Sequence, residues 1–242
     1  MKFIYPKCII MTTLNEQKLL KISEKAGRVC YKSEDKITNR SYKKFITQAI
    51  ELEHHSIIEH SYISVKFVMD RGISHELVRH RLCNFSQEST RYCRYNNELT
   101  FIIPEWTQNI KEGSYINSTD VYNKLSLNCC EKEFVSLLED IEDMYKILLD
   151  EYEWSAQKAR AILPNCLKTE IVSTANLREW RHILSLRTSP GSHPQIKEVM
   201  YPLLEEFNKH IPTIFEDIYE KRSKEEYYKN KKFNTIIEYD IE

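Results

Sequence analysis

Glycine is scarce in this chain of 242 residues, and its scarcity excludes two common nucleotide-binding motifs. Only four glycines occur, at positions 27, 72, 113 and 191. They form neither the GxGxxG fingerprint of Rossmann folds nor the GxxxxGK[ST] sequence of P-loop proteins. If the protein binds nucleotides, side chains must hold the phosphates, because no glycine-rich backbone cradle is available.

The chain also lacks a strong charge of either sign and a long hydrophobic run. Its formal net charge is −1 and its pI is about 6.7, which argues against a protein that holds nucleic acid mainly by electrostatic attraction. No stretch reaches the roughly 18 apolar residues of a membrane-spanning helix, and residues 1–7 contain no long apolar segment. We therefore expect no membrane association, and any anion site must be local.

Paired cysteines are missing as well. The seven cysteines are odd in number and form no CxxC motif; they stand at positions 8, 30, 83, 93, 129, 130 and 166. Scattered thiols are typical of a reducing compartment, so we expect a cytoplasmic protein. Apolar residues make up 41% of the chain, which is sufficient for a hydrophobic core.

Hydrophobic periodicity predicts an α+β fold with a small central sheet and long helical insertions. We expect a single domain over residues 1–242, with a lysine-rich tail from about residue 221. Strands are predicted over residues 61–69, 99–103 and 167–174. Helical periodicity covers residues 15–26, 39–53, 121–151, 155–163, 177–186, 196–209 and 211–221.

The middle of the chain is expected to contain a turn, a short helix and two loops. Residues 70–72 are typical of a turn, and Ser74 is a suitable N-cap for a helix that carries Glu76, Arg79 and His80. Residues 84–92 are polar and are predicted to form a loop, as are residues 105–120.

Residues 79–92, which read RHRLCNFSQESTRY, are the most informative segment. Every cation-capable residue between Gly72 and Asn96 is arginine or histidine, and none is lysine. The guanidinium group is a rigid fork of donors that suits phosphates and planar carbonyl edges. A solvated helix face with a Glu76–Arg79 ion pair is the simpler interpretation of one arginine. It does not explain a short span that contains four, because like charges repel without an anionic partner; the four are Arg79, Arg81, Arg91 and Arg94.

Two other kinds of chemistry are disfavoured. His75-Glu76 and His80 resemble HExxH with one residue too many, and helical residues five apart are rotated by roughly 140°, so the two rings diverge. We therefore predict no metal site. Ser86, Ser89 and Cys83 lie near His80 in sequence, but no GxSxG motif supports a covalent nucleophile.

Arg160 and Arg187 stand in apolar surroundings, within Ala-Arg-Ala-Ile-Leu-Pro and Leu-Ser-Leu-Arg respectively. An unpaired buried guanidinium costs several kcal/mol, so each needs a partner. From the residues alone, an internal ion pair and a functional role are equally good interpretations.

The spacing Arg-His-Arg, seven residues, then Ser-x-Arg-Tyr resembles the signature of the flavin-dependent thymidylate synthases. Further segments resemble that family in the same order. Residues 54–60 resemble its His-x-(Ser/Thr)-x-x-Glu-His segment, and residues 159–164 its Ala-Arg-x-x-Leu-Pro segment. Residues 176–178 resemble its Asn-x-Arg element, and Leu186-Arg187 with residues 192–195 resembles its Leu-Arg and Ser-His-x-Gln elements.

The resemblance implies that the protein makes dTMP from dUMP by reductive methylation. Methylenetetrahydrofolate is then the carbon donor, NADPH the reductant and FAD the hydride carrier, and no enzyme cysteine attacks the uracil. It also implies a homotetramer with small-molecule substrates and no nucleic-acid partner. The alternative is an Arg- and Tyr-rich nucleic-acid-binding module that uses residues 79–95, with Tyr92 and Tyr95 as stacking platforms.

Site residues follow from the resemblance. Arg187 is expected to be the catalytic cation, because it favours ionisation at N3 of the uracil. The expected dUMP-binding residues are Glu76, Arg79, Gln87, Glu88, Ser89, Arg91, Arg160 and Arg187. The expected FAD-binding residues are Ser56, Arg79, His80, Arg81, Gln87, Asn176, Arg178 and His182. Departures from the family pattern occur at Gln87, where many members have Glu, at Glu76, where some have Gln, and at His182, where some have Asn.

Overall fold

The structure is a computed structural model that describes residues 1–95 and 97–241. The chain divides into two compact units, each assembled from three segments. Unit 1 comprises Met1–Lys7, Phe67–Leu77 and Ser86–Ile171. Unit 2 comprises Cys8–Lys66, Val78–Phe85 and Val172–Glu242.

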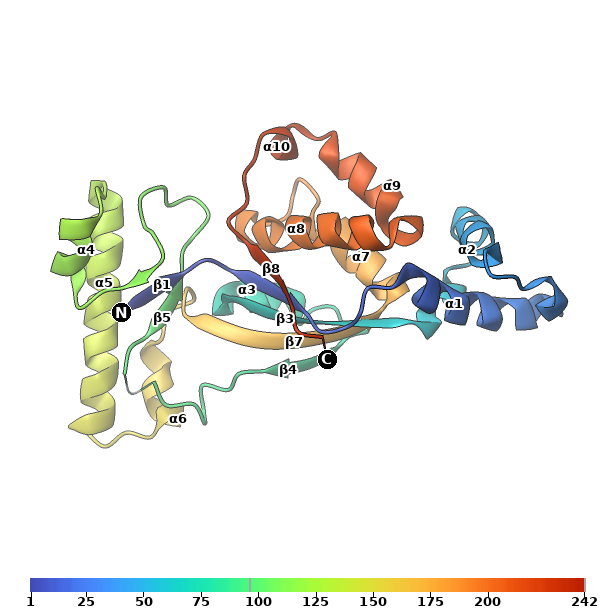
Figure 1. The fold of residues 1–242 in the computed structure, drawn as a ribbon. Coiled ribbons are helices and arrows are strands. Elements are labelled where there is room, and N and C mark those ends of the chain that lie inside the picture. The colour runs from blue at the N-terminus through green and yellow to red at the C-terminus, as the bar shows by residue number, and fades with distance from the viewer. Residues whose placement is uncertain (96, 242) are drawn as a thin grey trace. The chain divides into compact units, whose positions relative to one another are not determined.

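Two small sheets contain the strands (Figure 1). In the three-stranded sheet, β1 (Lys2–Ile4) lies between β5 (Thr100–Ile102), which is parallel to it, and β6 (Gly113–Ser114), which is antiparallel. The five-stranded sheet has the order β4-β7-β3-β2-β8. Its strands are β4 (Asn84–Gln87), β7 (Lys168–Asn176), β3 (Tyr62–Asp70), β2 (Lys7–Ile10) and β8 (Ile236–Tyr239).

Unit 1 has its own hydrophobic core, which includes Phe3, Phe101, Val135, Tyr145 and Leu167. The helices of this unit are α3 (Arg71–Leu77), α4 (Ser118–Lys124), α5 (Cys129–Asp150), α6 (Ala156–Ala159) and the 3-10 helix η3 (Arg160–Ile162). Helix α5 begins with a capping box, in which Asn128 and Glu131 satisfy each other's backbone N–H groups.

Unit 2 is mainly helical. Trp180, at 0% exposure, packs edge-on against Phe207 and donates its indole N–H to the Ile63 carbonyl at 2.9 Å. This residue joins α7 (Leu177–Arg187) to strand β3 and to α8 (Pro194–His210). The other helices are α1 (Glu16–Tyr31), η1 (Glu34–Lys36), α2 (Ser41–Glu51), η2 (His55–His60), α9 (Pro212–Ser223) and α10 (Glu226–Lys229).

The α+β prediction is confirmed, and the predicted strands and most of the predicted helices are present within a few residues of their expected limits. The helix over residues 121–151 is instead two helices, α4 and α5, because Asn128 caps a new helix after a break at residues 125–128. Part of the loop expected at residues 105–120 forms β6 and the start of α4.

The short helix after β3 begins earlier than expected. The predicted turn at residues 70–72 is wrong, because β3 continues to Asp70 and α3 begins at Arg71. The Asp70 side chain accepts the backbone N–H of Ile73 at 2.6 Å and so caps this helix in place of Ser74. Helix α3 ends at Leu77, so Arg79 and His80 lie in the turn that follows it and not on the helix.

Two further segments contain elements that the sequence did not predict. Residues 84–87 of the predicted loop form β4, an edge strand, where a polar composition is tolerated because one edge meets solvent. The lysine-rich tail also contains structure: Tyr228 is buried and stacks on Tyr201 with 4.0 Å between ring centroids, and β8 joins the sheet beside β2. Among the described residues, none of the helices is both long and apolar enough to cross a membrane.

Candidate active site

The Arg-His-Arg motif places its members in different environments. Arg79 and Arg81 are exposed, whereas His80 between them is buried, at 4% exposure. A turn allows this alternation, because successive side chains leave the backbone on different sides. The two arginines are therefore accessible to an anion, and the histidine is available for contacts inside unit 2.

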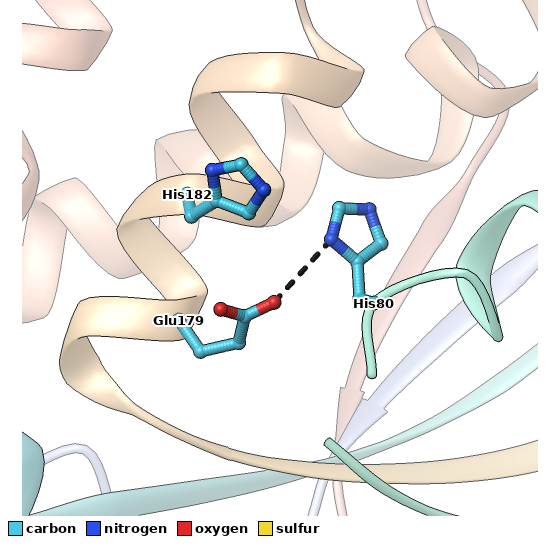
Figure 2. A group of neighbouring side chains, drawn as sticks. All are labelled: His80, Glu179 and His182. Carbon is cyan, nitrogen blue, oxygen red and sulfur yellow. Dashed lines mark ion pairs between the residues drawn. The ribbon is translucent and has the colours of Figure 1, made fainter. Parts of the chain in front are cut away.

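His80 contacts two residues of α7 through its two ring nitrogens. The Nε–H of Arg187 donates to Nε2 of His80 at 2.9 Å. On the other side, Nδ1 lies 3.4 Å from Oε1 of Glu179. A dashed line in Figure 2 marks this contact. The His182 ring approaches His80 edge-on, with 5.5 Å between centroids.

The electrostatics of this group keep His80 neutral. Burial, together with the Arg187 charge and His182, lowers the pKa of His80 to about 4. Burial raises the pKa of Glu179, although His182 and Arg178 act in the opposite direction. The His80–Glu179 contact is consequently one between a neutral imidazole and a buried carboxyl group at neutral pH, and not a full ion pair.

The start of α7 positions three of these side chains. Asn176 is its N-cap, and the Asn176 side chain accepts the backbone N–H of Glu179 at 2.8 Å. The side chain expected to bind FAD therefore also fixes the first turn of the helix. Arg178 is exposed and forms an ion pair with Glu59 at 2.5 Å.

Unit 2 contains a cavity of about 690 Å³ beside this helix. Its lining includes six cation-capable side chains, namely His55, Arg178, Arg181, His182, Lys221 and Arg222. A second cavity, of about 410 Å³, is lined by Ser56, His54 and Arg178 among others. Volume and charge suit a large anionic cofactor such as FAD.

Arg181 and Lys221 were not anticipated from the sequence. Arg181 is paired with Asp217 of α9 at 2.6 Å, and Lys221 lies at the end of the same helix. Because α9 packs against α7 in unit 2, residues more than 30 positions apart line one cavity. No sequence motif signalled this, since the pairing of the two helices decides it.

Unit 1 contains a separate anion-compatible cavity, of about 540 Å³. Arg160 lines it and donates to the hydroxyl of Thr90 at 3.3 Å. Arg71 and His75, one helical turn apart on α3, also line it and were not anticipated. The spacing of four residues is the signal that could have identified this pair.

The remaining predicted residues of unit 1 make protein contacts. Arg91 donates to the Gln157 side chain at 3.0 Å, and the Ser89 hydroxyl accepts the Arg91 backbone N–H at 3.3 Å. Gln87 donates to Ser74 at 2.8 Å and to Thr169 at 3.3 Å.

The carboxylate of Glu88 accepts from three protein donors: the Tyr95 hydroxyl at 2.7 Å, Lys168 at 2.9 Å and the Glu170 backbone N–H at 3.2 Å. It is thus a local structural centre of unit 1. Glu76 is half-buried on α3.

The predicted sites divide between the units in an uneven way. All expected FAD-binding residues except Gln87 belong to unit 2. Of the expected dUMP-binding residues, Arg79 and Arg187 belong to unit 2. The other six belong to unit 1: Glu76, Gln87, Glu88, Ser89, Arg91 and Arg160.

The comparisons with known sequences agree with one another. A family profile described as "Thymidylate synthase complementing protein" matches residues 12–213. The flavin-dependent thymidylate synthase of Corynebacterium efficiens is 35% identical over 206 residues, which cover 80% of this chain and 77% of the relative. The enzyme of the same name from Mycobacterium sp. (strain JLS) is 32% identical over 201 residues, with 80% and 78% covered.

Two solved structures have a similar fold. Thymidylate Synthase X from Helicobacter pylori, solved with FAD and dUMP, is 22% identical with a TM-score of 0.65, covering 89% of this chain and 99% of that chain. The UMP/dUMP methylase PolB from Streptomyces cacaoi, bound with 5-Br dUMP, is 24% identical with a TM-score of 0.68, covering 89% and 96%. At these identities the likeness establishes the fold.

Proposed function

The chain belongs to the flavin-dependent thymidylate synthase family, and on this premise we propose that it converts dUMP to dTMP by reductive methylation. Methylenetetrahydrofolate is the carbon donor and NADPH the reductant. Bound FAD supplies the hydride chemistry, and the protein binds, orients and polarises. A nucleic-acid-binding module receives no support from the comparisons, in which the named relatives are enzymes of one family.

The cation-lined cavity of unit 2 is the observation that carries this proposal. Arg178 and His182, both expected to bind FAD, line it together. The donor set fits a flavin diphosphate, because guanidinium and imidazole groups replace the backbone cradle that a glycine-poor chain cannot form. Ser56 and Arg178 line the second cavity, which offers a hydroxyl donor to the same cofactor.

Binding of dUMP is assigned to two sets of residues. Ser89, Arg91 and Arg160 supply the hydroxyl and guanidinium donors that a phosphate requires. Arg187 lies at the end of α7 and stabilises negative charge on the uracil ring, which raises electron density at C5 where the new carbon is attached. The dUMP-binding set is completed by Glu76, Arg79, Gln87 and Glu88. The FAD-binding set is completed by Arg79, His80, Arg81, Gln87 and Asn176.

We extend the proposal to the assembly and the compartment. The enzyme is a homotetramer located in the cytoplasm. Each subunit is one domain that spans residues 1–242. We assign this self-association to the face of α5 that carries the exposed apolar side chains Leu137 and Met144.

The test is a flavin assay on the purified chain. We expect FAD to copurify, and we expect reduced flavin kept free of oxygen to be oxidised when dUMP and methylenetetrahydrofolate are added, with dTMP as product. Arg178→Ala should weaken FAD binding, whereas the control Arg94→Ala should not, since Arg94 forms an exposed ion pair with Asp150. A colourless protein that takes up no FAD on titration would refute the proposed function.

A further inference from the structure

We infer that Glu179 is a positioning residue for Arg187, acting through His80. In this arrangement the carboxylate of Glu179 holds the proton of His80 on Nδ1, and the opposite nitrogen, Nε2, holds the guanidinium of Arg187. The inference rests on the proposed function, which assigns Arg187 to the uracil ring, and it adds the residue that keeps this cation in place.

The protonation of His80 follows from the identity of its partner. A guanidinium group has donors and no acceptor, so the contact of 2.9 Å between Arg187 Nε and His80 Nε2 requires a lone pair on Nε2. A neutral imidazole with a lone pair on Nε2 carries its hydrogen on Nδ1. A doubly protonated ring would instead direct an N–H at another N–H and set two cations side by side. The low pKa of His80, about 4, agrees with the neutral ring.

Glu179 lies beside that nitrogen. Its Oε1 lies 3.4 Å from Nδ1, and both residues are buried, at 6% and 4% exposure. A carboxyl group on one ring nitrogen commonly fixes the tautomer and orientation of a histidine whose other nitrogen does the work. Glu179 is itself held at the third position of α7, where Asn176 caps its backbone N–H at 2.8 Å.

Helix α7 places both Glu179 and Arg187 beside the His80 ring. Glu179 and Arg187 are eight residues apart on α7, slightly more than two turns. His80 reaches this helix from the turn after α3, and Figure 2 shows its ring directed toward Glu179. The imidazole of His80 can therefore contact both residues. Through it, the buried Glu179 in the first turn of α7 fixes the position of the half-buried Arg187 at the end of the helix.

A metal site is the competing interpretation of this group. Ligand atoms of His80, Glu179 and His182 all lie within 4.8 Å of one another. However, Nε2 of His80 already accepts from Arg187, and Nδ1 faces Glu179. A metal ion would have to displace one of these partners and would bring a second positive charge next to the guanidinium. The contacts favour positioning.

Two substitutions of Glu179 separate its role from a general effect on the fold. Glu179→Gln keeps a carbonyl oxygen that accepts from Nδ1–H, so we expect turnover within about threefold of wild type. Glu179→Leu removes the acceptor, and we expect kcat to fall about 10- to 100-fold, the usual scale for the loss of such an orienting partner. Affinity for FAD and dUMP should change little in Glu179→Gln, and in Glu179→Leu it should fall less than kcat does. Glu216→Leu, which removes an exposed carboxylate of α9, is the control.

The tautomer itself can be measured on the wild-type holoenzyme by ¹⁵N NMR of labelled histidine, with His80→Gln used for assignment. We expect the Nδ1–H form in wild type and in Glu179→Gln, and loss of that form in Glu179→Leu. An Nε2–H form in wild type would overturn the inference, even if Glu179→Leu fails to fold. So would wild-type kcat in a folded Glu179→Leu, or stoichiometric zinc that is bound through His80 and needed for turnover. Failure of the proposed function is separate, since a wild-type protein that makes no dTMP reveals it.

Discussion

Cys83 lies within the signature segment, and burial determines its reactivity. Burial and the Glu179 charge raise the pKa of the thiol to about 11, although the neighbouring Ser173 acts in the opposite direction. A thiol with such a pKa is protonated at neutral pH, and the thiolate is the reactive form. This agrees with a reaction in which no cysteine attacks the uracil.

We therefore predict that Cys83→Ala keeps most of the wild-type turnover. The measurement is dTMP formation at saturating dUMP and FAD, with the exposed Cys30→Ala as control. Loss of turnover in Cys83→Ala with intact binding of both ligands would instead indicate covalent catalysis.

Arg187 is expected to depend on the shape of its side chain as well as its charge. Arg187→Lys keeps the positive charge but loses both the planar fork and the Nε–H that His80 accepts. We predict that turnover falls by about 10²-fold or more, the scale for losing one donor that acts in the transition state. FAD affinity should change little.

The control for Arg187 is Arg94→Lys, which keeps an exposed ion pair. Near wild-type turnover in Arg187→Lys, or a loss that FAD release explains entirely, would remove Arg187 from the activating role. Arg160 would then be the next candidate.

The lowered pKa of His80 makes the stability of the folded protein depend on pH. Glu179, His182 and Arg187 face its ring, and its pKa in the folded protein is about 4, against about 6.5 in an unfolded chain. Between these values the unfolded state binds more protons than the folded state, so stability falls as the pH drops from about 6.5 to about 4. The largest possible loss from this group is about 3 kcal/mol, at 1.36 kcal/mol per pKa unit.

Urea unfolding at pH 7 and pH 4.5 checks this dependence. His80→Gln has no titrating ring and keeps an oxygen that can accept from Arg187, so it should lose less stability over the same interval than wild type. Equal losses in the two proteins would contradict the assignment of a low pKa to His80.

At the scale of elements, the start of α5 depends on one carboxylate. Glu131, at 5% exposure, accepts the backbone N–H groups of Gln108, Asn109 and Asn128 at 2.9–3.0 Å and the Asn109 amide at 2.9 Å. Burial alone would raise the pKa of Glu131, but these hydrogen bonds together lower it. The loop before α4 is thereby tied to the first turn of α5.

Glu131→Gln replaces one of the two accepting oxygens with an NH₂ group, which then faces the N–H groups of Gln108, Asn109 and Asn128. We predict a loss of about 2 kcal/mol or more in the free energy of unfolding, because a buried donor is left without a partner. In wild type the contribution is present above the ordinary pKa of the carboxyl group and is lost as the pH falls through its lowered folded value. Denaturant unfolding measures both effects, with the exposed Glu133→Gln on the same helix as control. An unchanged midpoint in Glu131→Gln would mean that the loop holds α5 by other contacts.

At the scale of the whole molecule, the proposed tetramer can be tested through α5. Leu137 is 56% exposed and Met144 is 46% exposed. The two residues are seven positions apart on α5 and so lie on the same side of the helix. We predict that Leu137→Glu lowers the molar mass in solution below that of the wild-type assembly, as measured by light scattering coupled to size exclusion. If the subunits still associated through this face, the introduced glutamate would be buried in the interface without a partner, which destabilises the assembly.

Asp143→Lys is the matched control for this experiment. Asp143 is exposed and lies about 120° around the helix from Leu137, so its substitution should leave the assembly unchanged. A wild-type monomer would contradict the proposed tetramer. An unchanged mass for Leu137→Glu would place the interface elsewhere.

Local patterns in the sequence were sufficient to predict the periodic elements and the family. The alternation at residues 61–69 and the helical repeat at residues 177–186 and 196–209 predicted β3, α7 and α8, because each element buries one face and that face is written in consecutive residues. The arginine-rich signature was recognised for the same reason, since its fixed residues are near neighbours. Strands β1, β2 and β8 were missed, because three or four residues are too few to establish a period.

Contacts between side chains that are distant in sequence depend on how the elements pack. His80 and Arg187 are 107 positions apart, and neither residue's neighbours in sequence indicate the other. The caps also belong to this class: Asp70 and not Ser74 starts α3, because the direction in which β3 leaves the sheet sets where the first free N–H groups lie. Local periodicity records burial along one element, whereas contacts between elements depend on how buried faces pack, and this packing turned a recognised motif into a histidine held between a carboxylate and a guanidinium.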